Sequence, residues 1–399
     1  MRRFTLALAT LATLASSSAR ADAKFSLDDG LVLRFEEIDT RVHVGGRLHL
    51  DYAFFDDDRT PIDDDFDVRR GRPLIEVNVG DDWKAKFEYE LGVERNGIRA
   101  AWLQWDGIDH LKLRVGNQTL PFGLEENESS NYLVFNERSL ASALGPNYGT
   151  GVMLAGDGRL VGRSRFTAAG AVYFEPFGDD GYDRHGSDQV GFAGRATFAP
   201  VARKRRVVQI GASLDYRSIR GDDDWRVSRR PESQLAPTLI GVALSEVESV
   251  TAYAFEAAAM FGPVLFQGEY IRSGVDRNRG SALPNVDFHG AYAQLSWVIT
   301  GERHRYSRSL ATFGGVKPKR QFGALEAALR WSTLDANDRG VLGGEADDIT
   351  LGLSWWIREN ARLMFNYVRV DAKVQDPLLP AALVSDEPQI FALRFVFHL

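Results

Sequence analysis

The chain contains no cysteine. Among its 399 residues this absence excludes disulfide bridges and every form of thiol chemistry. Lysine is scarce as well, since eight of the 48 basic residues are lysines and the other forty are arginines. Arginine presents a planar fork of donors that suits phosphate and carboxylate, but a GC-rich genome explains the same bias.

The chain also lacks a surplus of positive charge and an internal helix-length hydrophobic run. Its formal net charge of −7 disfavours nucleic acid as a partner. No internal stretch of about 18 uncharged apolar residues occurs, so no transmembrane helix is predicted. A β-barrel is not excluded by this test, because only one face of each strand contacts lipid.

Catalytic motifs are missing too. The seven histidines are scattered, and neither H-E-x-x-H nor G-x-S-x-G occurs. We therefore predict a protein that is not an enzyme, with no catalytic residue, no cofactor and no metal site.

The first 21 residues have the pattern of a secretory signal. Met1-Arg2-Arg3 is basic, Phe4 to Ala15 is a short apolar run, and Ala19-Arg20-Ala21 is an A-x-A cleavage site. We expect residues 1–21 to be a cleaved signal peptide and residues 22–399 to form a single domain.

That domain is rich in short alternating segments, in which every second residue is apolar, separated by Gly, Asp and Asn. An exported, cysteine-free chain with this pattern indicates an all-β outer-membrane protein, an antiparallel transmembrane β-barrel of about 16 strands. The predicted strands are Arg41–Phe54, Phe66–Gly80, Trp83–Gly92, Ile98–Trp105, His110–Gln118, Tyr148–Gly156, Arg163–Phe174, Gln189–Phe198, Val207–Arg217, Val250–Met260, Val264–Arg272, Val286–Ile299, Phe322–Trp331, Ala346–Ile357, Ala361–Val370 and Gln389–Leu399.

The alternation also assigns side chains to the two faces of the barrel. In Trp83–Gly92 the odd positions are apolar and the even positions are Lys84, Lys86, Glu88 and Glu90. Because apolar residues must face lipid, the charged positions are predicted to face the lumen. The same rule places 13 basic and 7 acidic residues inside, and a basic lumen enriches anions. The remaining predicted lumen residues are Arg70, Arg72, Glu76, Lys112, Arg114, Arg165, Arg195, Asp215, Arg217, Glu256, Glu269, Glu326, Arg330, Arg358, Arg362 and Arg394.

The links between strands fall into two length classes. Gly80–Asp82 and Arg358–Asn360 are short and are predicted to be periplasmic turns. The link Pro121–Asn147 is unusually apolar, and we expect it to fold inward against the lumen wall. The longer polar links are predicted to be extracellular: Phe55–Asp65, Asp179–Asp188, Ser218–Ser249, Ser273–Asn285, Thr300–Gln321 and Asp371–Pro388.

Six segments of the chain, which occur in the same order as in the family, resemble the phosphate-selective porin O and P family of Gram-negative outer membranes. The most specific runs from Arg114-Val115-Gly116-Asn117-Gln118 through Pro121-Phe122-Gly123-Leu124-Glu125 to Phe135-Asn136-Glu137-Arg138. The others are Gly46–Tyr52, Phe66–Leu74, Leu295–Tyr306, Phe322–Ser332, and Gly352–Trp356 with Arg362–Tyr367. Two differences are the terminal Leu399, where members usually end in Phe, and the acidic Glu88 and Glu90 beside Lys84 and Lys86.

The resemblance implies an outer-membrane homotrimer through which small anions, phosphate first among them, diffuse passively. Its partners would be outer-membrane lipid, lipopolysaccharide and the barrel-assembly machinery. The basic residues expected along the anion pathway are Arg70, Arg72, Lys84, Lys86, Lys112, Arg114 and Arg330. The residues expected in the constriction loop are Pro121, Phe122, Gly123, Glu125, Tyr132 and Arg138.

Several alternatives stay open at this point. Lys84 and Lys86 either bind anions or join an interior salt-bridge network with Glu88 and Glu90. Arg69 is either a further pathway arginine or an interfacial residue, and its phase, opposite to that of Arg70 and Arg72, favours the interface. The tryptophans, including Trp102 and Trp356, are expected to lie on the lipid face more often than in the lumen. A general or organic-anion porin and a structural barrel with a plugged lumen are the alternative functions.

Overall fold

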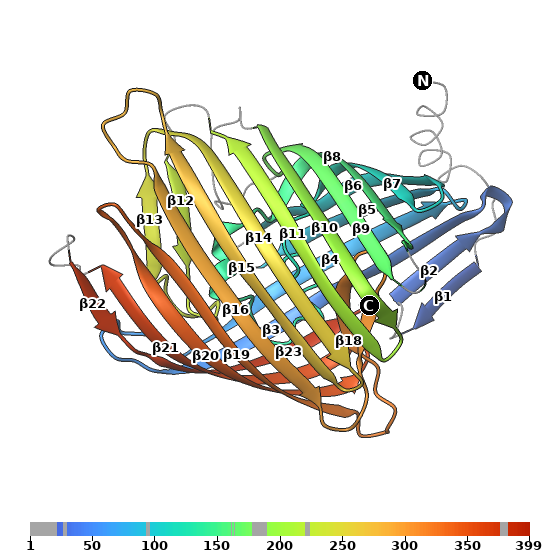
Figure 1. Cartoon of the computed structure of the whole chain (residues 1–399). Helices are drawn as coiled ribbons and strands as arrows, with labels where there is room; N and C mark the ends of the chain where they lie inside the picture. The colour runs from blue at the N-terminus through green and yellow to red at the C-terminus, as the bar shows by residue number, and fades with distance from the viewer. Residues whose placement is uncertain are drawn as a thin grey trace.

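A computed structural model describes residues 22–26, 30–92, 96–160, 162, 164–177, 190–219, 224–375 and 382–399. The expected signal peptide, residues 1–21, and the predicted loop Asp179–Asp188 lie outside the described residues. Figure 1 shows strands that tilt around a common bore.

Sixteen antiparallel strands form a closed barrel, as predicted. Each of the sixteen predicted ranges overlaps one of them, so the all-β barrel is confirmed. They are β3 (Thr40–Asp56), β4 (Asp65–Val79), β5 (Trp83–Leu91), β6 (Asn96–Ile108), β7 (Leu111–Thr119), β8 (Tyr148–Gly158), β9 (Arg165–Phe174), β10 (Val190–Arg203), β11 (Arg206–Ser218), β14 (Val247–Phe261), β15 (Val264–Arg277), β16 (Val286–Val298), β19 (Ala324–Asp338), β20 (Val341–Arg358), β21 (Ala361–Gln375) and β23 (Gln389–His398).

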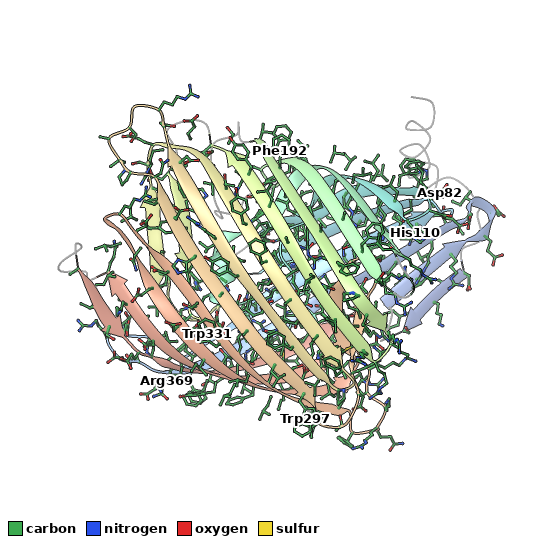
Figure 2. All side chains as sticks on the ribbon, viewed as in Figure 1. Asp82, His110, Phe192, Trp297, Trp331 and Arg369 are labelled. Carbon is green, nitrogen blue, oxygen red and sulfur yellow. The ribbon has the colours of Figure 1, made fainter. Side chains whose placement is uncertain are left out.

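The last strand closes the barrel on the first. β23 pairs with β3 from Gln389 opposite Asp56 to His398 opposite Arg47. We call the end of the barrel where β3 begins and β23 stops the terminal end. Asp82 and His110, in turns at this end, lie near β1 and β2 in Figure 2.

The alternation predicted from the sequence separates the two faces of the barrel wall. On β5, Phe87 is 45% exposed on the outside, whereas Glu88 is 3% exposed inside. Phe192, Trp297 and Trp331 likewise project from the outer surface, where each is about half exposed (Figure 2). Twelve of the twenty charged residues predicted to face the lumen are buried, which supports the sorting rule.

Two additions to the barrel were not predicted. β1 (Asp22–Ser26) and β2 (Gly30–Phe35) form a hairpin, and β2 pairs with the first residues of β3, Thr40–Val44. β23 pairs with the rest of β3, from Arg47 onward. At the opposite end, β22 (Leu383–Asp386) pairs with the last residues of β21. The helices of the described part are two short 3-10 turns, η1 (Glu36–Ile38) and η2 (Leu140–Leu144). None of its helices has the length and apolarity needed to cross a membrane.

The link between β7 and β8, residues 120–147, folds into the bore, as predicted. We call it the first inward loop. Phe122, Leu140 and Leu144 are at most 1% exposed and join a hydrophobic cluster with residues of the far wall. η2 within this loop packs on β15, β16 and β19. The apolar side chains of the loop therefore anchor it across the lumen.

The link between β11 and β14 also enters the bore. The link Ser218–Ser249 was predicted to be a polar extracellular loop, and that prediction was wrong because part of the link is buried inside the barrel. Its hairpin, β12 (Trp225–Arg229) and β13 (Ile240–Leu244), packs on η2 and β20. Trp225 and Ile240 are at most 2% exposed in the same cluster as Phe122. We call residues 224–246 the second inward loop.

The link between β16 and β19, residues 299–323, enters from the terminal end and is the third inward loop. The prediction that Thr300–Gln321 is extracellular is incompatible with the prediction that Arg358–Asn360 is periplasmic, because both segments lie at this end. Loop length alone does not reveal the end of the barrel. Arg305 forms an ion pair with Glu359, in the short turn between β20 and β21 at that end. The loop contains β17 (His304–Ser307) and β18 (Thr312–Val316), and Phe313 packs against Leu124 of the first inward loop.

Candidate permeation pathway

A cavity of about 820 Å³ lies in the bore between the first two inward loops and the wall that β3 to β11 form. Twelve basic and six acidic side chains line it, so basic side chains outnumber acidic ones by six. The basic residues are Arg47, Arg69, Arg70, Arg72, Lys86, Arg99, Arg114, Arg138, Arg217, Arg226, Arg229 and Arg230, and the acidic residues are Glu88, Glu126, Glu128, Glu137, Glu175 and Glu232.

A network of ion pairs on β3, β4 and β5 neutralises part of this charge. Arg72 pairs with both Glu88 and Glu90, and its Nη1 lies 3.4 Å from Glu88. Arg47 of β3 also reaches Glu88, with Nη2 at 2.9 Å. Arg70 lies 3.3 Å from the buried His49. Arg70 and Arg72 thus line the cavity, but Arg72 is occupied by carboxylates.

Lys84 and Lys86 are both paired with carboxylates. Lys86 lines the cavity, with Nζ 3.2 Å from Glu76 and 3.3 Å from Glu88. Lys84 lies 2.6 Å from Asp106 and is outside the set of lining residues. The geometry favours the salt-bridge network over dedicated anion-binding lysines at these two positions.

Arg114 differs from the other predicted pathway residues. Its guanidinium donates two hydrogen bonds to Gln104 Oε1, at 2.9 and 2.6 Å, and stacks on Trp102 with 4.2 Å to the ring centroid. No carboxylate of the described residues forms an ion pair with Arg114. Lys112, two residues earlier on the same strand, is outside the lining set. Arg114 is therefore a cation in the cavity that is held in place by a neutral partner and an aromatic face.

Arg330 of β19 is fully buried and lies away from the cavity. Its Nη1 donates to Glu125 at 3.1 Å and its Nε donates to Glu232 at 2.9 Å. These carboxylates belong to the first and second inward loops, and Nη2 also donates to the Glu137 carbonyl oxygen at 2.9 Å. Arg330 thus connects two loops to the wall, which differs from the pathway role predicted for it.

The predicted constriction-loop residues mostly hold the loop in place. Pro121 and Phe122 are buried, and Gly123 has φ +66° where its N–H donates to Ser213 at 3.0 Å. Tyr132 packs against the cluster around Trp356.

Arg138 and Glu125 support the same loop from within. Arg138 Nε lies 3.0 Å from Glu126 and donates to the Glu125 carbonyl oxygen at 3.1 Å. The Glu125 carboxylate accepts from the backbone N–H and the hydroxyl of Ser139. Of the six predicted loop residues, only Arg138 also lines the cavity.

Arg69 lines the cavity, so its prediction as an interfacial residue was wrong. The pairing of β3 with β4 shifts register between His49 and Leu50, which leaves Arg69 as the extra residue of a β-bulge and turns it inward. Its guanidinium binds the Glu137 carboxylate with two hydrogen bonds, at 2.7 and 2.9 Å. Although burial alone would raise the pKa of Glu137, Arg69, Arg394 and Arg70 hold that pKa well below its usual range.

Trp102 and Trp356 were also misplaced by the prediction. Trp102 lines the cavity, and Trp356 is 1% exposed and donates to Glu326 inside the bore. The prediction treated tryptophan as an apolar residue that contacts lipid. Inside the bore, however, a tryptophan ring can stack on an arginine, as Trp102 does on Arg114. Arg362 lies 4.3 Å from the Trp356 ring centroid in the same way.

Glu128 of the first inward loop joins three parts of the molecule. Its Oε1 accepts from Gln267 of β15 at 2.8 Å and from the backbone N–H of Phe313 in the third inward loop at 2.9 Å. Burial raises the pKa of this carboxyl to about 8. Glu128 also lines the cavity, so its charge bears directly on the ions inside.

Sequence reasoning missed several lining residues for identifiable reasons. Arg47 has the correct phase, because Leu48 and Tyr52 mark the outward positions of β3, and the alternation could have identified it. Arg69 and Arg99 sit at register shifts, which alternation does not reveal. Arg229 and Arg230 lie in the second inward loop, which was predicted to be outside the bore.

The chemistry that the lining of the cavity offers to an anion is mainly charge-assisted hydrogen bonding from guanidinium groups. Within them, no group of three or more His, Cys, Asp or Glu side chains is arranged to hold a metal ion. Several guanidinium groups along the cavity can each replace part of the water around an anion. This arrangement suits transient binding at successive positions.

Comparison with known proteins agrees with this geometry. The family model for "Phosphate-selective porin O and P" matches residues 42–399. Porin O from Pseudomonas aeruginosa is 25% identical over 390 residues, covering 88% of this chain and 87% of that protein.

Solved structures share the fold at low sequence identity. The anion-selective porin from Comamonas acidovorans has a TM-score of 0.53 and 13% identity, over 90% of this chain and 100% of the other. The trimer form of OmpT, an outer-membrane protein of Vibrio cholerae, has a TM-score of 0.55 and 14% identity, over 90% and 99%.

Proposed function

Since the chain belongs to the phosphate-selective porin O and P family, we propose that it carries small anions, with phosphate as the principal substrate, across the outer membrane by passive diffusion. The family and the fold are those of a Gram-negative outer-membrane channel rather than of an enzyme. By this proposal the terminal end faces the periplasm.

The observation that carries the proposal is the charge of the lining. The whole chain has a net charge of −7, yet the cavity beside the first inward loop is lined by twelve basic and six acidic side chains. In a narrow bore with low-dielectric walls, such a surplus raises the local concentration of anions and repels cations. The name of the family and the name of the similar anion-selective porin also support a preference for anions.

In this mechanism an anion moves between guanidinium groups and stays weakly bound at each. Arg114 is preorganised by Gln104 and Trp102, so it offers its remaining donors without first losing a carboxylate partner. The paired residues, such as Arg72, contribute charge to the field but are shared with Glu88 and Glu90. Binding must remain weak, because an anion held tightly at one site would not leave.

The extent of this pairing favours a second candidate, a general or organic-anion porin without phosphate selectivity. Carboxylates neutralise Arg47, Arg69, Arg72 and Lys86, which lowers the field that a doubly charged phosphate requires. The three inward loops raise a further candidate, a structural barrel with a plugged lumen. A plugged barrel would not conduct ions, so conductance separates it from both porin candidates.

The assembly and the partners of the barrel also belong to the proposal. We infer a homotrimer, in line with the trimer form recorded for OmpT of Vibrio cholerae. The exposed aromatic residues of the outer surface suit contact with outer-membrane lipid and lipopolysaccharide. Insertion would require the barrel-assembly machinery.

The test is a single-channel recording of the purified protein in a planar bilayer. In a potassium chloride gradient the sign of the reversal potential should show preference for chloride over potassium. Adding inorganic phosphate should then reduce the chloride current if phosphate occupies the pathway. Cation preference would refute the anion porin, absence of current would favour the plugged barrel, and no effect of phosphate would favour the general porin.

A further inference from the structure

A second basic hollow lies at the terminal end, apart from the candidate pathway. It has a volume of about 680 Å³ and shares no lining residue with the larger cavity. Two surfaces form it, the third inward loop on one side and the ends of β8 to β10 on the other. Its lining residues are Asp157, Arg165, Arg203, Lys204, Arg303, Arg305, Tyr306, Arg308 and Ser309.

The charges around this hollow are poorly balanced. Six cations face one carboxylate, and that carboxylate, Asp157, is shared by Arg165 at 4.0 Å and by His110 at 3.7 Å. Arg305 pairs outside the hollow with Glu359. Within the part of the chain that the structure describes, four of the cations have no carboxylate partner: Arg203, Lys204, Arg303 and Arg308.

An adjoining hollow of about 390 Å³ extends the same surface. It shares Arg165, Arg203, Lys204 and Arg308, and adds Arg159. Like charges that line one hollow repel one another, and an anion between them relieves that repulsion. Burial, followed by the charges of Arg205 and Arg305, lowers the pKa of Arg303.

The basic residues come from both surfaces of the hollow. Arg303 and Arg308 belong to the third inward loop, whereas Arg203 ends β10 and Lys204 lies in the turn between β10 and β11. The tip of the loop is fixed further in, where Arg195 donates to the Leu310 and Ala311 carbonyl oxygens at 2.9 Å each. An anion bound between the two surfaces would add a bridge from the loop to the wall.

We propose that this hollow is a binding site for a soluble multivalent oxyanion, with three or more negative charges, which clamps the third inward loop to the wall. Inorganic phosphate carries too little charge to balance four unpaired cations, which separates this site from transient occupancy of the pathway. The third inward loop also contacts a lining residue of the candidate pathway, because the Phe313 N–H donates to Glu128. A bound anion would therefore act on the channel from the terminal side.

The direct test is isothermal titration calorimetry of the detergent-solubilised barrel with fructose 1,6-bisphosphate. Binding is expected for the wild type, and replacing both loop cations, in Arg303→Gln with Arg308→Gln, should weaken it about tenfold or more. The matched control is Arg279→Gln with Arg339→Gln, which removes two exposed arginines at the opposite end and should leave affinity unchanged. Circular dichroism and heat-modified gel mobility establish that each variant is folded.

Two results would overturn the site: no binding by the wild type, or equal binding by the loop variant. A third comparison separates it from the pathway, since Arg114→Gln should not change this affinity, and a loss there would place the ligand in the larger cavity. The proposal does not depend on conduction, because calorimetry reports binding even if the barrel passes no current. If the barrel does conduct, the bisphosphate should reduce conductance from the terminal side only.

Discussion

Glu125 of the first inward loop lies 3.1 Å from Arg330 of β19, and the same guanidinium binds Glu232 of the second inward loop. In the sequence, Glu125 lies 205 positions and Glu232 lies 98 positions before Arg330. Arg330, Glu232 and Glu125 are 1%, 2% and 3% exposed, so all three groups are largely shielded from bulk water. One buried cation therefore fixes the relative position of two loops that border the candidate pathway.

Replacing Arg330 with alanine should release both loops. The change leaves Glu125 and Glu232 buried without their cation, which typically costs about 3–5 kcal/mol. The barrel itself should survive, because its strand pairs do not depend on this contact. We expect a folded barrel with a lower melting temperature and a larger, noisier single-channel conductance. Arg279→Ala, an exposed arginine, is the control, and an unchanged conductance trace for Arg330→Ala would contradict the role assigned to Arg330.

The charge of Glu128 should make ion selectivity depend on pH. Burial raises the pKa of Glu128 to about 8, so its carboxyl is mostly protonated at neutral pH and ionises as pH rises through about 8. A raised pKa means that stability from this group is present at lower pH and is lost as pH rises through that value. Ionisation also adds one negative charge to the lining.

We therefore expect the preference for anions over cations to decrease between about pH 7 and pH 9. Reversal potentials in a fixed salt gradient measure this directly. Glu128→Gln keeps the shape of the side chain without the titration, so its selectivity should stay constant over the same range. A wild type whose reversal potential does not change with pH would show that Glu128 does not titrate there.

The barrel could be predicted because each strand carries its own signal, an alternation that depends only on neighbouring residues in the sequence. Lipid on one side of each strand imposes a period of two, and that period located all sixteen strands of the barrel. The apolar content of residues 120–147 likewise revealed the first inward loop, since Phe122 and Leu140 need somewhere to pack.

The pairing of charges was not predictable, because it depends on contacts between distant residues. Arg330 was expected to face ions, but its partners Glu125 and Glu232 come from loops whose positions the alternation does not encode. Arg69 was assigned to the interface, because a β-bulge interrupts the period without any mark in the sequence. Long polar loops, such as residues 299–323, bury few apolar side chains and so give little sign of insertion.

The proposed periplasmic position of the terminal end, where the third inward loop enters, can be tested in cells. The chain has no cysteine, so a single introduced cysteine reports without background. The Lys317 side chain is 71% exposed in this loop, and Lys317→Cys should react with a bulky, membrane-impermeant maleimide only after the outer membrane is permeabilised. Arg279→Cys, at the opposite end, should react on intact cells. Labelling of Lys317→Cys on intact cells would place the loop at the extracellular end.

Arg114 should contribute more to anion preference than the lysines do. It lines the cavity and has a neutral partner, Gln104, whereas Lys84 is paired with Asp106 and lies outside the lining. Arg114→Glu changes the lining charge by two units, in a lining where basic side chains outnumber acidic ones by six. In water a unit charge about 4 Å from an ion is worth about 1 kcal/mol, and salt screens it further, so we expect the permeability ratio of anions to cations to fall roughly three- to tenfold.

The matched control is Lys84→Glu, which reverses a charge of the same sign on the same side of the lumen. It should have a smaller effect, because Lys84 is already neutralised and lies outside the cavity. Adding Lys112→Glu to Arg114→Glu tests whether a second cation of β7 acts with Arg114, in which case anion preference should be abolished or reversed. Reversal potentials for the four proteins, wild type included, decide the matter. If Lys84→Glu lowers the ratio as much as Arg114→Glu does, selectivity comes from the overall charge of the bore and not from the unpaired arginine.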